Sequence, residues 1–240
     1  MIKKLSIIFP LFNEEKRLKK TFLEIVNFKK KAKNRKIEII FVDDGSDDKS
    51  KLLIHNFINK IKSKKFILKY YKLKKNMGKG FALKFGVQRS SMPWILTTDI
   101  DLSVPLSQVI KWEKLKFART KNVIFGSRNL ENSKVDKKLT RYILGKIFNF
   151  FVSKILNINL SDTQCGFKLY NSKIAKKIFS KLTNFGFTHD LELVILFQIE
   201  GVKIKELPVK WTHKMGSKLN ILIEPIKMFL NILYLKFKYL

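Results

Sequence analysis

The predicted fold rests on the stretch Ile37-Glu38-Ile39-Ile40-Phe41-Val42-Asp43-Asp44-Gly45-Ser46-Asp47-Asp48. Its first half is an apolar run of strand length, and its second half is a loop that contains four aspartates. Residues 49–62 then show a helical pattern, with apolar side chains on one face. A strand, a loop and an amphipathic helix in this order are the building unit of an α/β protein.

The same order of elements recurs along the first half of the chain. Apolar runs of strand length also lie at Leu5–Phe9, Phe66–Tyr71, Trp94–Thr98 and Val123–Phe125. Helical patterns separate these runs at Glu14–Lys33 and Lys79–Arg89. From residue 139 onward helices dominate, and short strands are expected at Gly166–Tyr170 and Val202–Val209. The alternation predicts an α/β fold with a mostly parallel sheet and helices on both faces.

The composition indicates a folded and strongly basic protein. The 240 residues are enough to bury about 70% of the unfolded surface, which excludes a disulfide-stapled miniprotein. Lys and Arg number 50 against 19 Asp and Glu, a formal net charge of +31. This charge suits an anionic membrane surface or nucleic acid. Compositional drift is the alternative explanation, because the excess is almost entirely Lys and only six of the 50 basic residues are Arg.

The cysteine content and the first residues argue against secretion. Cys165 is the single cysteine and cannot form an internal disulfide, as is usual in a reducing compartment. Lys3 and Lys4 precede an apolar run, as in a signal peptide, but Pro10 and Asn13 follow without a small-residue cleavage site. We therefore expect this run to form the first strand and the protein not to be secreted.

Two segments are candidates for contact with a membrane surface. No run reaches the roughly 18 to 20 apolar residues that span a bilayer. Leu139–Leu160 and Leu219–Leu240 nevertheless combine large apolar residues with lysines. Both are predicted to lie in a headgroup layer, and ordinary core helices are the alternative. On this basis we expect a peripheral protein at the cytoplasmic face of a membrane.

Chemically active residue types recur at four predicted strand ends. Open parallel sheets bind ligands beyond the carboxyl ends of their strands. The residues concerned are Asn13 and Glu14, Asp43–Asp48, Asn76–Gly80, and Asp99 with Asp101. This recurrence predicts a ligand site at that edge of the sheet.

Asp99 and Asp101 are the candidate metal ligands. They are two residues apart, so an extended backbone turns both carboxylates to the same side. Clustered carboxylates repel one another unless a cation or hydrogen-bond donors offset their charge. This pair suits Mg²⁺ or Mn²⁺, with water and a diphosphate as the remaining ligands, and a pair of solvated turn acids is the alternative.

The loops after the second and third strands offer groups for a nucleotide. Asp43 and Asp44 can accept hydrogen bonds from ribose hydroxyls or a base N–H, although a turn that caps the next helix explains part of this loop. Lys79 opens a predicted helix between two glycines, where backbone N–H groups and an ammonium favour phosphate oxygens. The segment is not a P-loop, because Phe81 replaces the Ser or Thr of that motif.

Four segments resemble the donor-site motifs of the family 2 glycosyltransferases, which have the GT-A fold. These segments are Ile8–Glu14, Val42–Asp47, Asn76–Ala82 and Asp99–Asp101. Others are similar to the dolichyl-phosphate glucosyltransferase branch and its bacterial relatives: Asp101–Pro105, Gly126–Arg128, Asp162–Lys168, Asp190–Leu193 and Trp211–Lys218. The resemblance extends from about residue 5 to 220. It implies a GT-A domain at 1–218, followed by an amphipathic C-terminal helix at 219–240.

The resemblance also implies roles for individual residues. The nucleotide-sugar site would include Pro10, Asn13, Glu14, Asp43, Asp44, Lys79 and Asp99, and the metal would be Mg²⁺ or Mn²⁺ on Asp99 and Asp101. The phosphate of the acceptor would be held by Arg128, Arg141, Lys168 and Lys218, for which a surface charge is the alternative. The catalytic candidates are Asp101, Asp162 and Asp190. The last two would orient a substrate or act as a base, or else only support a loop or helix cap.

The implied activity is the inverting transfer of glucose from UDP-glucose to a polyprenyl or dolichyl phosphate. GDP-mannose as the donor and a sugar hydroxyl as the acceptor are the alternatives. Ile100 and His189 depart from the residues usual in the family, and either change could alter which sugar is preferred. His189 is expected to be structural. A basic nucleic-acid-binding protein is the remote alternative. We expect no nucleic-acid partner, because the sequence offers few aromatic and Arg platforms for bases, and acidic loops at the sheet edge would repel phosphate without a metal.

Overall fold

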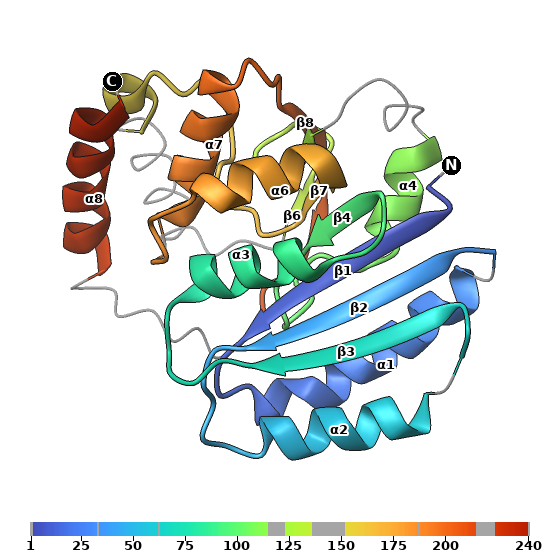
Figure 1. The fold of residues 1–240 in the computed structure, drawn as a ribbon. Coiled ribbons are helices and arrows are strands. Elements are labelled where there is room, and N and C mark those ends of the chain that lie inside the picture. Colours follow the sequence, from blue (N-terminus) through green and yellow to red (C-terminus); the bar gives the residue numbers. More distant parts are fainter. Residues whose placement is uncertain are drawn as a thin grey trace.

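Strands and helices alternate from β1 to β5 (Figure 1). The computed structural model describes residues 2–32, 34–61, 63–114, 123–135, 152–186, 188–214 and 224–239. The first elements are β1 (Lys4–Leu11), α1 (Glu15–Lys31), β2 (Lys36–Asp43), α2 (Ser50–Lys60), β3 (Phe66–Lys72), α3 (Lys79–Arg89) and β4 (Trp94–Thr97). The later ones are α4 (Gln108–Lys114), β5 (Val123–Ser127), β6 (Lys134–Val135), β7 (Lys168–Asn171), α6 (Ser172–Lys181), α7 (His189–Ile199), β8 (Lys205–Pro208), β9 (Lys210–Trp211) and α8 (Glu224–Tyr239).

The central sheet has seven strands in the order β3-β2-β1-β4-β7-β5-β8. All neighbours are parallel except β7, which runs antiparallel to both β4 and β5. Strands β6 and β9 form a separate two-stranded sheet. The chain builds outward from β1 to β3 and then returns to place β4 on the other side of β1. Such a reversal of strand order opens a crevice at the carboxyl ends, where open α/β sheets bind ligands.

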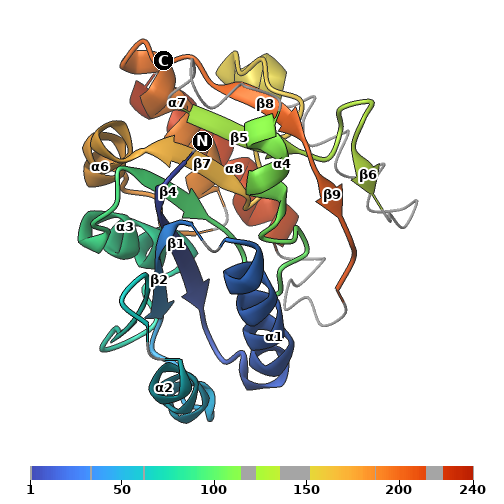
Figure 2. The ribbon, with the colours of Figure 1, turned by 90° about the vertical axis from the view of Figure 1, so that its right-hand side faces the viewer.

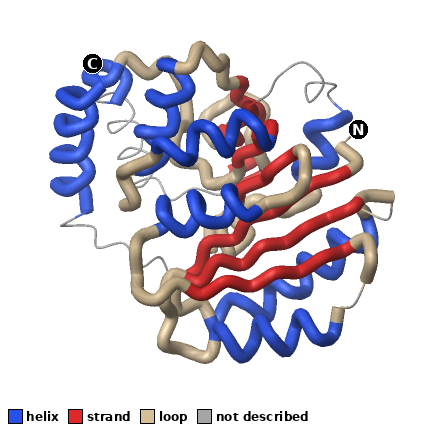
Figure 3. Tube along the Cα trace, viewed as in Figure 1, coloured by secondary structure: helices blue, strands red, loops and turns tan. Residues whose placement is uncertain are grey.

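Helices cover both faces of the sheet, as predicted. Figure 2 shows α1 and α4 on one side and α3 and α6 on the other, and Figure 3 shows the strands between these layers. Successive residues of a strand point to opposite faces. Ile7 of β1 accordingly packs in the core with α1 and α2, and Ile8 packs in the core with α3 and α6. Burial on both faces explains why β1 and β2 read as continuous apolar runs.

The mostly parallel α/β fold predicted from the sequence is confirmed, and each predicted strand overlaps an observed one. The antiparallel direction of β7 was not predicted, because an apolar run does not encode its pairing partner. Of the two candidate membrane segments, Leu139–Leu160 lies mainly outside the described residues, and the second contains α8. Within the described ranges, no helix combines the length and apolar character needed to cross a membrane.

Candidate active site

A cavity of about 540 Å³ lies at the carboxyl ends of β1, β2 and β4, as the sequence predicts. The sequence-predicted residues that line it are Pro10, Glu14, Asp44, Lys79, Asp99, Asp101 and Arg128. They come from five different loops and are far apart in the sequence. The fold therefore brings most of the predicted donor site together at one place.

Asp43 is the last residue of β2, and its carboxylate accepts hydrogen bonds from neighbouring residues of the protein. The side chain is fully buried. Its Oδ1 accepts a hydrogen bond from the Ser46 N–H at 2.8 Å, and its Oδ2 accepts one from the Tyr70 hydroxyl at 2.6 Å. Burial, together with this bond to Asp43, raises the pKa of Tyr70 well above its usual value. Asp43 thus shapes the loop, and its predicted contact with a nucleotide stays a prediction.

Asp44 connects the loop after β2 to the start of α3. Its two carboxylate oxygens accept hydrogen bonds from the N–H groups of Met77 at 2.7 Å and Gly78 at 2.8 Å. Gly78 has φ = 95°, a conformation that favours glycine and turns its N–H toward Asp44. Burial raises the pKa of Asp44 above its ordinary value, against the lowering effect of the two hydrogen bonds.

Lys79 and Asp99 form an ion pair across the cavity. The Lys79 Nζ lies 2.6 Å from Asp99 Oδ1, and both side chains are partly exposed. Burial opposes the charge of Asp99, but the Lys79 ammonium outweighs it and holds the pKa of Asp99 below its usual value. Gly166 lies directly against this carboxylate, where a Cβ atom would be 2.7 Å from Asp99 Cγ. The position of Asp99 is therefore fixed by a cation on one side and by backbone on the other.

Asp101 follows two residues later and points into the open space of the site. Its Oδ1 accepts a hydrogen bond from the Ser103 N–H at 2.9 Å. Ile100 between the two aspartates is buried, and its carbonyl accepts a hydrogen bond from the Thr21 hydroxyl at 2.6 Å. The bond to Thr21 ties the Asp99–Asp101 segment to α1.

Arg128 and Asp162 form a bidentate pair. The Nε and one terminal nitrogen of Arg128 lie 2.7 Å and 2.8 Å from the two carboxylate oxygens of Asp162, and the Arg128 N–H donates to the same group at 2.9 Å. Asp162 is buried, whereas the Arg128 side chain keeps 29% of its surface exposed and lines the cavity. Asp162 therefore orients the guanidinium that faces the site.

Lys168 and Asp190 are paired in the interior. Lys168 has only 1% of its surface exposed, its ammonium bonds to Asp190 Oδ1, and it lies 4.6 Å from the centre of the Phe125 ring. His189 is equally buried, with Nδ1 2.7 Å from the Gly186 carbonyl oxygen and Nε2 3.3 Å from Asp190 Oδ1. Burial opposes ionisation of Asp190, but His189, Lys168 and Lys79 outweigh it and lower its pKa to about 2.

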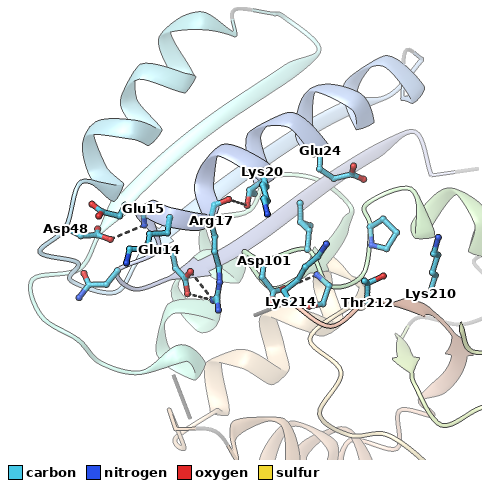
Figure 4. A pocket seen from close by; sticks show the side chains of 16 residues that line it. Glu14, Glu15, Arg17, Lys20, Glu24, Asp48, Asp101, Lys210, Thr212 and Lys214 are labelled. Carbon is cyan, nitrogen blue, oxygen red and sulfur yellow. Dashed lines mark hydrogen bonds and ion pairs between the residues drawn. The ribbon is translucent and has the colours of Figure 1, made fainter. Parts of the chain in front are cut away.

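A second and larger cavity, of about 740 Å³, adjoins the first (Figure 4). Asn13 lines it, as do Lys20 of α1, Lys210 of β9 and Thr212. The two cavities share Glu14, Arg17, Asp101, Ser103 and Lys214. Asp101 therefore stands where the two spaces meet, which suits a reaction between two substrates.

Some cavity residues escaped the sequence analysis, and some predicted residues cannot be placed. Arg17 pairs with Glu14 at 2.9 Å, and Lys214 lines both cavities, yet neither received a role. Lys214 lies within Trp211–Lys218, one of the segments that resemble the family, and this resemblance could have indicated a role for it. Arg141 and Lys218 lie outside the described residues.

The Asp99 and Asp101 carboxylates fit a hard divalent cation. Both line the same cavity, and oxygen donors are what Mg²⁺ and Mn²⁺ prefer. The part of the chain that the structure describes holds no cluster of three or more His, Cys, Asp or Glu that could ligate a metal. Water and a substrate diphosphate would therefore complete the coordination, as is usual for Mg²⁺.

Comparison with known sequences gives consistent similarities over almost the whole chain. The family model described as Glycosyl transferase family 2 matches residues 6–179. The dolichyl-phosphate beta-glucosyltransferase of Dictyostelium discoideum is 34% identical over 246 residues, which cover 98% of this chain and 75% of that protein. The protein of the same name from Homo sapiens is 32% identical over 249 residues, covering 99% and 76%.

Comparison with solved structures agrees on the fold. Glucosyl-3-phosphoglycerate synthase from Mycobacterium tuberculosis, solved with Mn²⁺, UDP-glucose and glycerol 3-phosphate, matches with a TM-score of 0.64 at 15% identity. The match covers 99% of this chain and 80% of that one. At this identity the likeness concerns the arrangement of strands and helices alone.

Proposed function

Because the chain belongs to glycosyl transferase family 2 and, within it, to the dolichyl-phosphate beta-glucosyltransferases, we propose that it transfers glucose from UDP-glucose to a polyprenyl or dolichyl phosphate. The enzyme is a hexosyltransferase with the GT-A fold. One observation carries the proposal. Asp44, Lys79, Asp99 and Asp101 converge on one cavity at the strand ends, in a chain that matches its relatives almost throughout.

The chemistry requires position and charge more than a strong base. An acceptor phosphate oxygen is already an anion, so it attacks the anomeric carbon of glucose without losing a proton. As this carbon–oxygen bond forms, the bond from the same carbon to the β-phosphate of UDP breaks, and its configuration inverts. The protein must hold two anions in line and stabilise the departing UDP.

Residues of the smaller cavity supply these functions. The Lys79 ammonium lies beside Asp99 and provides positive charge for the diphosphate. Asp99 and Asp101 would hold Mg²⁺ or Mn²⁺, which when bound would neutralise charge on the leaving group. At the carboxyl ends of β1 and β2, the proposed contacts of the nucleoside are Pro10, Asn13, Glu14, Asp43 and Asp44. Of these, Pro10, Glu14 and Asp44 line the smaller cavity.

Arg128 is the proposed contact of the acceptor phosphate. Its guanidinium is held by Asp162 and still faces the cavity, and Arg is well suited to bidentate phosphate binding. Lys168 is a weaker candidate, because its ammonium is buried against Asp190. The pair that Lys168 and Asp190 form supports a positioning role for Asp190. Arg141 and Lys218 stay predictions for this phosphate.

We further propose that residues 1–218 form the transferase domain and that 219–240 form an amphipathic helix. The acceptor is a lipid, so we place the enzyme at a membrane surface, on its cytoplasmic face. Nucleic acid has no part in the proposal. The names of the relatives support glucose and lipid phosphate over GDP-mannose or a sugar hydroxyl.

Release of UDP by the purified protein tests the proposed function. With UDP-glucose and Mg²⁺ or Mn²⁺, we expect UDP only when a polyprenyl phosphate is present, and none after chelation of the metal. GDP-mannose and free sugars serve as parallel substrates. Release with free sugars but none with the lipid phosphate would overturn the proposed acceptor, and a preference for GDP-mannose would overturn the proposed donor.

A further inference from the structure

Helix α8 is fixed to the rest of the protein along one side. Ile232 and Leu235 are 1% and 0% exposed. At its end, the Tyr239 hydroxyl donates a hydrogen bond to Glu192 Oε1 at 2.6 Å, and Lys238 Nζ donates one to the Thr183 hydroxyl at 2.5 Å. These contacts join α8 to α7 at the edge of the molecule (Figure 1).

Another side of α8 carries an exposed apolar stripe, formed by Leu230, Tyr234 and Phe237. These side chains are 60%, 54% and 89% exposed. Their spacing of four and then three residues places them on one face of a helix. Four of the eight large apolar side chains that are exposed in the described ranges belong to α8. Exposed apolar residues are therefore clustered on this helix.

Lysines border this stripe. Lys236 and Lys238 flank Phe237 in the sequence, and at about 100° per residue they lie on the two sides of the stripe. The Lys238 ammonium holds α8 to Thr183 and Glu192, whereas the exposed Lys236 can place its methylenes along apolar surface and its ammonium group among phosphates. A face of Leu, Tyr and Phe with Lys at its margins is typical of helices that lie in the plane of a membrane interface.

We propose that the stripe of Leu230, Tyr234 and Phe237 is a docking surface for an anionic lipid bilayer. This inference rests on the proposed function, because an acceptor with a long polyprenyl chain stays in a membrane. Helix α8 carries Lys236 and Lys238 in its last turn and the apolar stripe on one exposed side, so we expect it to lie in the plane of the membrane interface. The helix thereby holds the transferase domain next to the leaflet that contains its acceptor.

Charge distinguishes a bilayer from a second copy of this chain as the occupant. Pairing two stripes would bring together lysine-bordered surfaces of two molecules that each carry a net charge of +31. An anionic leaflet instead complements both the lysines and the whole molecule. Each basic residue near such a surface adds about 1 kcal/mol of attraction.

Sedimentation with lipid vesicles tests the surface. The full-length protein is mixed with vesicles of phosphatidylcholine alone or with phosphatidylglycerol added, and the bound fraction is measured without any lipid phosphate. We expect binding to the anionic vesicles. The combined variant Leu230→Gln and Phe237→Gln should lower the partition coefficient about tenfold or more, because it removes two apolar groups from the interface.

A matched control removes two equally exposed leucines elsewhere. Leu23 on α1 and Leu52 on α2 are 61% and 58% exposed, so Leu23→Gln with Leu52→Gln should leave vesicle binding unchanged. Circular dichroism should show both double variants folded, since all four side chains are exposed. Equal loss of binding in the two variants, or no loss in the α8 variant, would overturn the assignment of the surface.

Two further measurements separate the remaining outcomes. If the native protein ignores vesicles but forms a dimer that the α8 variant abolishes, the stripe is a self-association surface and the proposal is wrong. With a short-chain polyprenyl phosphate in detergent, the α8 variant should release UDP as fast as the native protein. Absence of UDP release by the native protein in that assay would refute the proposed function and leave the vesicle result intact.

Discussion

Asp190 and Glu192 lie two residues apart in the first turn of α7, and their carboxylates hold different parts of the molecule. Asp190 pairs with Lys168 of the central sheet. Glu192 accepts hydrogen bonds from the Thr183 hydroxyl and the Tyr239 hydroxyl, each at 2.6 Å. One helical turn thus connects the interior next to the site with the helix that we propose to dock on a membrane.

Replacing Glu192 by Ala should loosen α8. The carboxylate is fully buried and accepts hydrogen bonds from Thr183, Asn184 and Tyr239, which would lose their acceptor. We expect a loss of about 3 kcal/mol in the free energy of unfolding. Hydrogen exchange should rise most in residues 224–239. Unchanged exchange there would show that other contacts hold the helix.

Acid should weaken the same attachment. Burial opposes the charge of Glu192, but hydrogen bonds from Thr183, Tyr239 and Asn184 outweigh it and lower its pKa below the usual 4.5. A carboxyl whose pKa is lowered by folding stabilises the folded state above its unfolded pKa, and this stabilisation is lost as pH falls through the folded pKa. The difference in unfolding free energy between the native protein and Glu192→Gln should therefore shrink below pH 4.5. Urea unfolding in steps of pH checks this, and a constant difference would contradict it.

Replacing Asp101 by Ala should abolish turnover without unfolding the protein. The side chain lines both cavities and is the proposed metal ligand that has no ion-pair partner among the described residues. We expect UDP release to fall by at least about a hundredfold. Glu131→Ala is the matched control, because Glu131 is an exposed acid that lines neither cavity. Full activity of the Asp101 variant would remove this residue from the mechanism.

Replacing Gly166 by Ala should displace Asp99. The added Cβ would lie 2.7 Å from Asp99 Cγ, so the carboxylate must move away from its present position beside Lys79. We expect UDP release to slow about tenfold, with a destabilisation of about 1–3 kcal/mol. In the Asp99→Asn background the same substitution should cause little further loss of rate. Additive losses would show that Gly166 acts through another group.

Replacing Arg128 by Lys should weaken binding of the acceptor and leave binding of the donor unchanged. Lysine cannot reproduce the bidentate pair with Asp162 or a second one with a phosphate. We expect KM for the polyprenyl phosphate to rise about tenfold, equivalent to one charge-assisted hydrogen bond, and KM for UDP-glucose to stay constant. Steady-state kinetics with each substrate varied in turn measures the two KM values separately. A rise in KM for UDP-glucose alone would move Arg128 to the donor side.

The sequence predicted those elements whose signal is local. Burial on both faces makes β1 and β2 mainly apolar, with Ser6 and Glu38 as interruptions, so the positions of these strands and of the helix between them follow from residue patterns. The direction of β7 depends on contacts with β4 and β5, which are distant in sequence. The two-residue strands β6 and β9 are too short for any pattern to reveal.

Within the site, the residue types predicted which side chains lie in the cavity better than they predicted the partners of each side chain. Asp44, Lys79, Asp99 and Asp101 meet in the cavity because each follows a strand of the same sheet. The resemblance implied that Lys168 holds the acceptor phosphate, whereas the structure buries its side chain against Asp190. Only tertiary structure shows that a lysine within β7 faces the interior.

The two hydrogen bonds that Asp44 accepts from the start of α3 join the loop after β2 to that helix without any ligand. A nucleotide bound at the proposed site would then not have to order these two segments as well. We therefore expect the backbone of both segments to keep the same conformation with and without a nucleotide.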